Sequence, residues 1–254
     1  CFLYRASYPA DDAKPKGGLA PLDDYSLASR ISYFLWSSMP DDELFAAAEA
    51  GELRDQKGIE EQVERMIADP KSDRFVENFA GQWLYTRALK NHQPDYAAFP
   101  TFDEPLKNAM RRETELFLRE FLQTDLPLPE MLTANFTFVN DRLATHYGLD
   151  APGSDFVKVT LPDSRRGGLL KQAGLLTVTS YPTRTSPTKR GKWVLTQRLC
   201  DAPDPPPPGV EGLPKEMMPT GTTRERLAAH RDIPQCASCH TIIDPLGFGL
   251  EHYD

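Results

Sequence analysis

Apolar residues recur with a helical period over most of the first 150 positions. The segments with this pattern are residues 27–35, 59–68, 75–89, 106–121 and 139–147. A spacing near 3.6 places such residues on one face of a helix, where they can be buried. The pattern predicts an all-helical body, and it assigns the aromatic residues in these segments to core packing.

Helix start and stop signals sharpen this prediction. Residues 1–21 are rich in Pro and Gly and predict a lead-in loop, after which Asp23 or Asp24 begins the first helix. Pro40 ends that helix, and the acidic residues directly after it open a second one that Gly51 stops.

The second half has a different pattern. Residues 155–161 alternate between polar and apolar and predict one strand, which needs a partner and therefore a small ribbon. Residues 167–178 are apolar and predicted to be buried, and 192–199 predict a short helix. The proline run at 203–209 predicts an extended, stiff strap.

A capping box precedes the last part of the chain. Thr222 is followed three residues later by Glu225, which predicts a helix over 223–230. Asp244 and Pro245 then predict a turn, followed by apolar residues.

Charge and composition exclude some classes of protein. The 254 residues carry a net charge of −8 with a pI near 5.2, and no broad basic face suits nucleic acid. No stretch approaches the roughly 20 apolar residues of a transmembrane helix.

A beginning at Cys1 without Met predicts a piece of a longer protein. Whether Cys1 and Cys200 form a disulfide is left open by their spacing.

The motif Cys236-Ala237-Ser238-Cys239-His240 carries the most specific chemistry. Two cysteines at this spacing followed directly by histidine are typical of covalent c-type haem attachment. Each thiol adds to one haem vinyl group, and the adjacent imidazole becomes the proximal iron ligand. The motif thus predicts one haem c, with His240 on the iron.

Two other interpretations of the cysteines remain open. Cys236 and Cys239 could bind zinc together with His230 and His252, although no second ligand pair of regular spacing supports this. A thioredoxin-like redox pair requires a strand leading into a helix, and the polar residues 232–235 do not resemble one.

Methionines are the favoured candidates for the sixth iron ligand. Met217 and Met218 lie between the proline strap and the helix before the motif, and a thioether there would suit electron transfer. His230 and His252 are the alternatives, and an open sixth site is the third possibility.

A dense basic run is the candidate for binding the haem propionates. It comprises Arg184, Lys189, Arg190 and Lys192. Guanidinium groups bind carboxylates in a bidentate manner, so Arg184 and Arg190 are the expected contacts. Asp244 and Glu251 are possible acceptors for the imidazole N–H. Sequence templates for other catalytic sites are missing, so any chemistry belongs to the haem.

Four segments resemble a known pair of modules. Residues 22–42 and 132–140 resemble the helical domain of unknown function 1592, and residues 184–194 and 236–251 resemble the haem-bearing domain of unknown function 1588 that follows it. These modules occur in large secreted proteins of planctomycetes and related bacteria. The resemblance implies a secreted, c-type cytochrome-like protein, but it implies no reaction.

We therefore expect a mainly α fold. A helical module over residues 22–150 would pack against a loop-rich, mostly irregular haem c module over 151–254, with at most a small β ribbon. The expected function is electron transfer by one covalent haem in a larger secreted or periplasmic protein, with a redox protein or neighbouring modules as partners. A haem enzyme with an open sixth site, or a glycan- or surface-binding protein with a structural haem, is the alternative.

Overall fold

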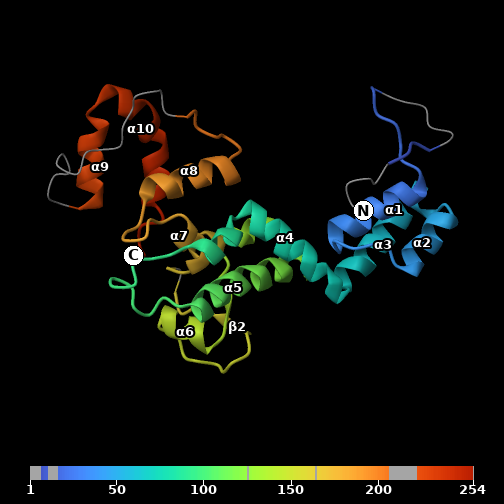
Figure 1. The fold of residues 1–254 in the computed structure, drawn as a ribbon, viewed down its shortest axis with the longest axis horizontal. Helices are drawn as coiled ribbons and strands as arrows, with labels where there is room; N and C mark the ends of the chain where they lie inside the picture. The colour runs from blue at the N-terminus through green and yellow to red at the C-terminus, as the bar shows by residue number, and fades with distance from the viewer. Residues whose placement is uncertain (1–6, 11–16, 125, 164, 206–221, 254) are drawn as a thin grey trace. The chain divides into compact units, whose positions relative to one another are not determined.

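The computed structural model describes residues 7–10, 17–124, 126–163, 165–205 and 222–253, and it is mainly helical (Figure 1). Two compact units divide the chain. Unit 1 consists of Cys1–Ala80 with Leu118–Asp125, and unit 2 consists of Gly81–Phe117 with Leu126–Asp254. The expectation of a mainly α fold with a small β ribbon and a loop-rich C-terminal part is confirmed.

The first two helices of unit 1 begin where the acidic start signals predict. The described part of this unit contains α1 (Asp24–Leu35), α2 (Asp42–Glu49), α3 (Gln56–Ala68) and most of α4 (Asp73–Trp83). Asp23, Asp41 and Asp55 each accept a hydrogen bond from the backbone N–H three residues later, which satisfies a donor that the helix leaves unpaired. Trp36, Leu44 and Met66 lie in the buried core between these helices.

Unit 2 contains a long helix and a two-stranded sheet. Helix α5 (Glu104–Gln123) contributes most of its length to this unit. Strand β1 (Phe136–Val139) pairs antiparallel with β2 (Val157–Thr160), in a register that sets Phe136 opposite Thr160. Helices α6 (Asp141–Tyr147) and α7 (Ala173–Val178) complete this part.

Two of the predicted helices have different boundaries. The helix predicted over 75–89 ends at Trp83, because Tyr85 adopts a left-handed conformation and a 3-10 helix, η4 (Thr86–Asn91), follows. The segment predicted as helical over 139–147 begins with the end of β1, and Asn140 caps α6. Pairing with β2 satisfies the backbone of residues 136–139, which helical periodicity does not detect.

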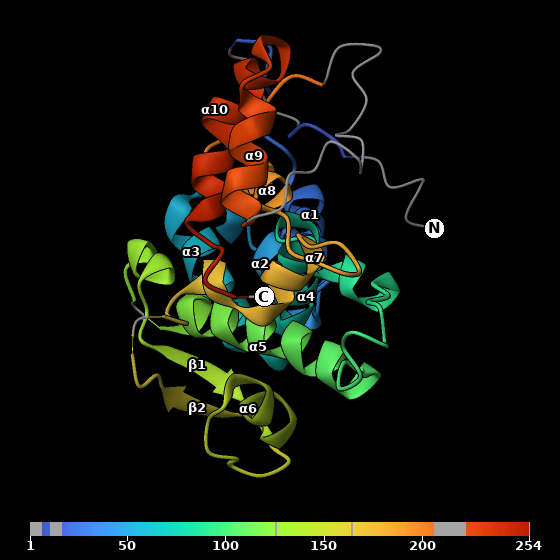
Figure 2. The ribbon, with the colours of Figure 1, turned by 90° about the vertical axis from the view of Figure 1, so that its left-hand side faces the viewer.

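Among its described residues, the C-terminal part of unit 2 contains three α-helices, α8 (Pro187–Arg198), α9 (Thr223–Arg231) and α10 (Pro234–Phe248). Helix α10 lies beside α8 and α9 (Figure 2). The predicted start of a helix at residue 192 is wrong, because Ser186 accepts from the Lys189 N–H and begins α8 five residues earlier.

The predicted turn at Asp244 and Pro245 is also wrong. Helix α10 continues through Pro245 to Phe248. A proline inside a helix costs about 3 kcal/mol, since it removes one hydrogen bond and crowds the preceding turn. Close packing of α10 against α8 offsets this cost.

Candidate functional site

Three residues of the predicted attachment motif share one face of α10. Cys236, Cys239 and His240 lie at positions i, i+3 and i+4, which adjoin one another on a helix surface. Both thiols are free and half-buried. Ile242, three residues after Cys239, is 59% exposed, so apolar surface lies next to the thiols.

The imidazole of His240 is held by a buried carboxylate one turn further along. The distance from His240 Nδ1 to Asp244 Oδ1 is 3.0 Å, and Asp244 is 0% exposed. Thr188 of α8 donates its hydroxyl to the same Oδ1 at 3.2 Å, and Arg231 Nη1 lies 3.8 Å from Oδ2. The carboxylate thus orients the ring with Nε2 directed away from it.

Glycines allow the backbones of α8 and α10 to touch. A Cβ on Gly191 would collide with the carbonyl oxygen of Ile243, and one on Gly247 would collide with that of Pro187. Because both collisions involve backbone atoms, a larger side chain would force the helices apart. This contact brings Thr188 against Asp244 and so connects the packing of α8 to the orientation of His240.

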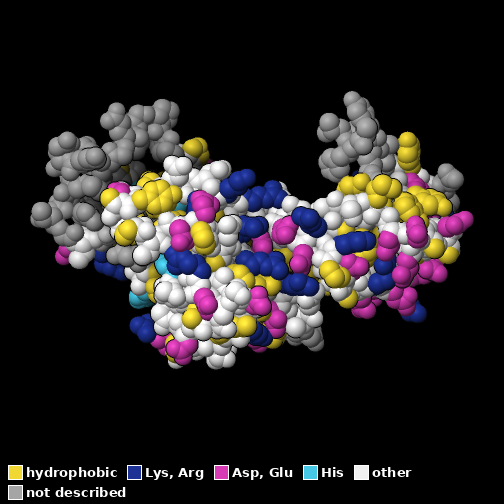
Figure 3. All heavy atoms as spheres, turned by 60° about the horizontal axis from the view of Figure 1, so that its bottom comes forward, with side chains coloured by type: hydrophobic (Ala, Val, Ile, Leu, Met, Phe, Trp, Pro, Cys, Tyr) yellow, Lys and Arg dark blue, Asp and Glu magenta, His cyan; other side chains and the backbone are white. Residues whose placement is uncertain are grey.

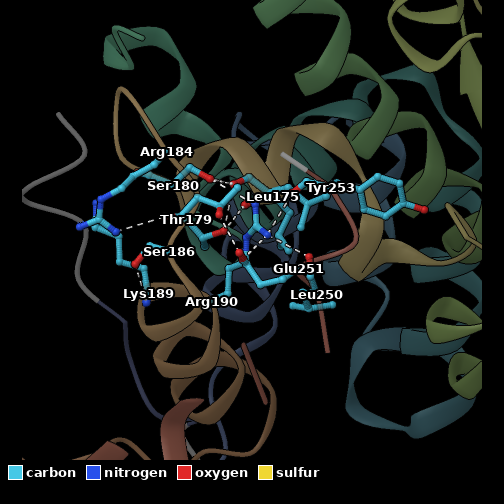
Figure 4. A network of polar contacts seen from close by, with 12 residues as sticks. Leu175, Thr179, Ser180, Arg184, Ser186, Lys189, Arg190, Leu250, Glu251 and Tyr253 are labelled. Atoms are coloured by element: carbon cyan, nitrogen blue, oxygen red, sulfur yellow. Dashed lines mark hydrogen bonds and ion pairs between the residues drawn. The ribbon is translucent and has the colours of Figure 1, made fainter. Parts of the chain in front are cut away.

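Arg190 is bound by the C-terminal segment of the chain. Its side chain is 2% exposed, its Nη1 donates to the carbonyl of Leu250 at 2.9 Å, and the same nitrogen pairs with Glu251. Nη2 lies 3.3 Å from the Ser180 hydroxyl (Figure 4). The side chain of Arg184 extends away from this network in the same view and stacks on Tyr181, 4.6 Å from the ring centre.

The remaining predicted site residues differ in where the structure places them. Asp244 contacts the imidazole as expected, whereas Glu251 does not, because it binds Arg190 and the Thr185 hydroxyl instead. His252 is exposed. Met217, Met218 and the side chain of His230 lie outside the described residues. Within the described part, no group of three or more His, Cys, Asp or Glu is arranged to hold a metal ion.

A buried polar cluster in unit 2 was not expected from the sequence. Glu113 of α5 accepts hydrogen bonds from Thr137 and Tyr147, each at 2.6 Å. Burial raises the pKa of Glu113 to about 7. The sequence signal for this cluster was the spacing of Glu113, which lies three residues after Met110 and four before Phe117 and therefore on the same buried face of α5.

Comparison with known proteins relates the chain to two families of unknown function. Residues 22–149 match the family described as protein of unknown function (DUF1592), and the chain belongs to this family. Residues 166–254 match a second model, described as protein of unknown function (DUF1588). Searches of curated proteins and of solved structures found no match. None of the helices in the described ranges is long and apolar enough to cross a membrane.

Proposed function

We propose that this chain carries one haem c, attached to Cys236 and Cys239 with His240 as proximal ligand, and that it transfers electrons within a larger secreted or periplasmic protein. The observation that carries the haem assignment is the placement of both free thiols and the imidazole of His240 on one face of α10, with the ring oriented by the buried Asp244. Covalent attachment of this kind takes place outside the cytoplasm, which gives the location.

The donor set fits such a group. Two thiols one helical turn apart and an adjacent imidazole are the residues that haem attachment requires. When bound, the haem would supply one-electron chemistry at its iron. The chain's residues position it. With Asp244 accepting a hydrogen bond from Nδ1–H of His240, the lone pair on Nε2 would be available to iron, and Thr188 donates a hydrogen bond to the same carboxylate.

The test is expression of the full chain in a host that matures c-type haem. The denatured protein should keep its haem, give a c-type pyridine haemochrome and show the mass of one covalent haem. Cys236→Ala with Cys239→Ala should lose the covalent haem, whereas Cys200→Ala, which removes an exposed cysteine outside the motif, should keep it. Two unmodified thiols in the wild-type motif would refute the proposal.

A haem enzyme is the second candidate, and the His240–Asp244 pair favours it. A charged acceptor raises the basicity of the imidazole and its donation to iron, which stabilises the ferric state and suits reactions with peroxide. The sixth ligand distinguishes the candidates. Met217→Leu with Met218→Leu should abolish a methionine–iron absorption band if the protein is a carrier. A high-spin ferric iron that binds cyanide readily in the wild type identifies an enzyme.

A further inference from the structure

A cleft of about 420 Å³ opens in unit 2, apart from the attachment motif. Its floor is apolar and includes Met110 and Leu176, and its walls come from the segment 92–102 and from the loop 180–185. The Asp95 N–H donates to the Pro182 carbonyl at 3.0 Å, so the two walls are joined by the backbone. Neither Cys236, Cys239 nor His240 is among the residues that line it.

The charge of the cleft is opposite to that of the chain. Arg166, Arg184 and Arg190 line it, and no described lining residue is Asp or Glu, although the chain contains 37 of them. Glu251 neutralises Arg190. Within the described part, neither Arg166 nor Arg184 lies within ion-pair distance of a carboxylate, and each stacks on tyrosine. At longer range, the charge of Arg166 lowers the pKa of the buried Glu113. On the face drawn in Figure 3, by contrast, Lys and Arg side chains are interspersed with Asp and Glu side chains.

The pKa values of two neighbouring groups are lowered by burial and by nearby positive charges. Burial, together with the charges of Lys189 and Lys107, lowers the pKa of His92 in the cleft wall. Burial and the charge of Arg184 lower the pKa of Lys189 at its edge. A ligand with a negative group would relieve the repulsion among these cations.

Stacking fixes the two arginines in place. The guanidinium of Arg166 lies 4.2 Å from the ring centres of both Tyr147 and Tyr253. Tyr181 supports Arg184 at 4.6 Å and Lys189 at 3.7 Å. A guanidinium held by aromatic rings retains its in-plane N–H donors for a carboxylate and loses little further entropy on binding.

We infer that this cleft binds a small organic carboxylate with a planar apolar body, whose anionic group pairs with one of the two arginines, Arg184 in the loop wall or Arg166 against Tyr253, while its ring packs on the apolar floor. The inference does not depend on the proposed haem. A haem propionate has the same carboxylate chemistry, so the experiment must distinguish the two sources.

The probe is benzoate, and its neutral isostere benzamide is the control ligand. Binding to the full chain is measured by saturation-transfer NMR and equilibrium dialysis. Benzoate should bind more tightly than benzamide, and Arg166→Gln with Arg184→Gln should weaken benzoate about tenfold, since charge-assisted pairs are lost. Arg165→Gln is the matched control, because Arg165 pairs with Asp163 and does not line this cleft. Equal binding of the two ligands, or equal loss in the control variant, would overturn the inference.

The source of the carboxylate is settled by comparing two forms of the chain. Benzoate should bind equally to the haem-loaded wild type and to Cys236→Ala with Cys239→Ala. If loading with haem abolishes benzoate binding, a propionate occupies the cleft and the inference of a free ligand is wrong. Thermal unfolding of every variant checks that a loss of binding is not a loss of fold.

Discussion

Gly191 of α8 lies against the backbone carbonyl of Ile243 in α10, with no room for a methyl group between them. This contact sits one helical turn from Thr188 and next to Asp244, so helix packing and the orientation of His240 share the same residues. The backbone approach explains why α10 continues through Pro245 despite the lost hydrogen bond.

Gly191→Ala should destabilise unit 2 by about 1–3 kcal/mol, because overpacking against a backbone atom forces a helix shift. The measurement is denaturant unfolding followed by circular dichroism. Lys192→Ala is the control, since Lys192 is exposed on the same helix. A stability change no larger than that of the control would show that the two helices do not touch.

Asp244→Asn should raise the redox potential of a haem bound at His240. The neutral amide accepts a weaker hydrogen bond from Nδ1–H, so the imidazole donates less to iron and the ferric state loses stability. Spectroelectrochemical titration measures the potential, and Thr188→Val, which removes only the support of the carboxylate, should give a smaller shift in the same direction. An unchanged potential in Asp244→Asn, with covalent haem retained, would contradict the role given to this residue.

Arg190 and Arg184 should respond differently to substitution. Arg190→Ala leaves Glu251 without its buried partner, which typically costs about 3–5 kcal/mol. Arg184 is exposed, so Arg184→Ala should leave the unfolding free energy nearly unchanged. If Arg184 binds a propionate, its removal should still shift the haem potential. A double-mutant cycle with Glu251→Gln measures the coupling in the first pair, and additive effects would exclude the ion pair.

Glu113 should make the stability of the protein depend on pH near neutrality. Burial raises its pKa from 4.5 to about 7 in the folded chain, so between these values the folded state binds the extra proton. Stability is then fully present below pH 4.5 and falls as pH rises through 7, by about 3 kcal/mol at most. Glu113→Gln should flatten this slope.

The measurement is the free energy of unfolding at pH 5 and pH 8 for the wild type and the variant. Glu130→Gln, at an exposed position, serves as the control and should keep the wild-type slope. If the wild type unfolds with the same free energy at both pH values, the carboxylate does not titrate in this range and the raised pKa is wrong.

The sequence alone determined the local features of this protein. Capping aspartates and apolar spacing predicted where α1, α2, α3 and α5 lie, because these signals act within one or two turns of a helix. The spacing of Cys236, Cys239 and His240 predicts haem attachment, which stays a prediction. Alternation over residues 155–161 predicted β2.

Tertiary structure decided the features that depend on partners distant in sequence. Strand β1 was missed because its backbone hydrogen bonds go to β2, about twenty residues later in the chain. Asp244 and Pro245 predicted a turn, yet α10 continues through Pro245, because the packing of its backbone against Gly191 offsets the cost of a proline inside a helix. Long-range packing also pairs Glu251 with Arg190, whereas Asp244 reaches His240 because helix α10 continues through the predicted turn and sets these two residues four positions apart on one face. Spacing alone had left the choice between the two carboxylates open, because it does not show whether the helix continues or which side chain lies beside α8.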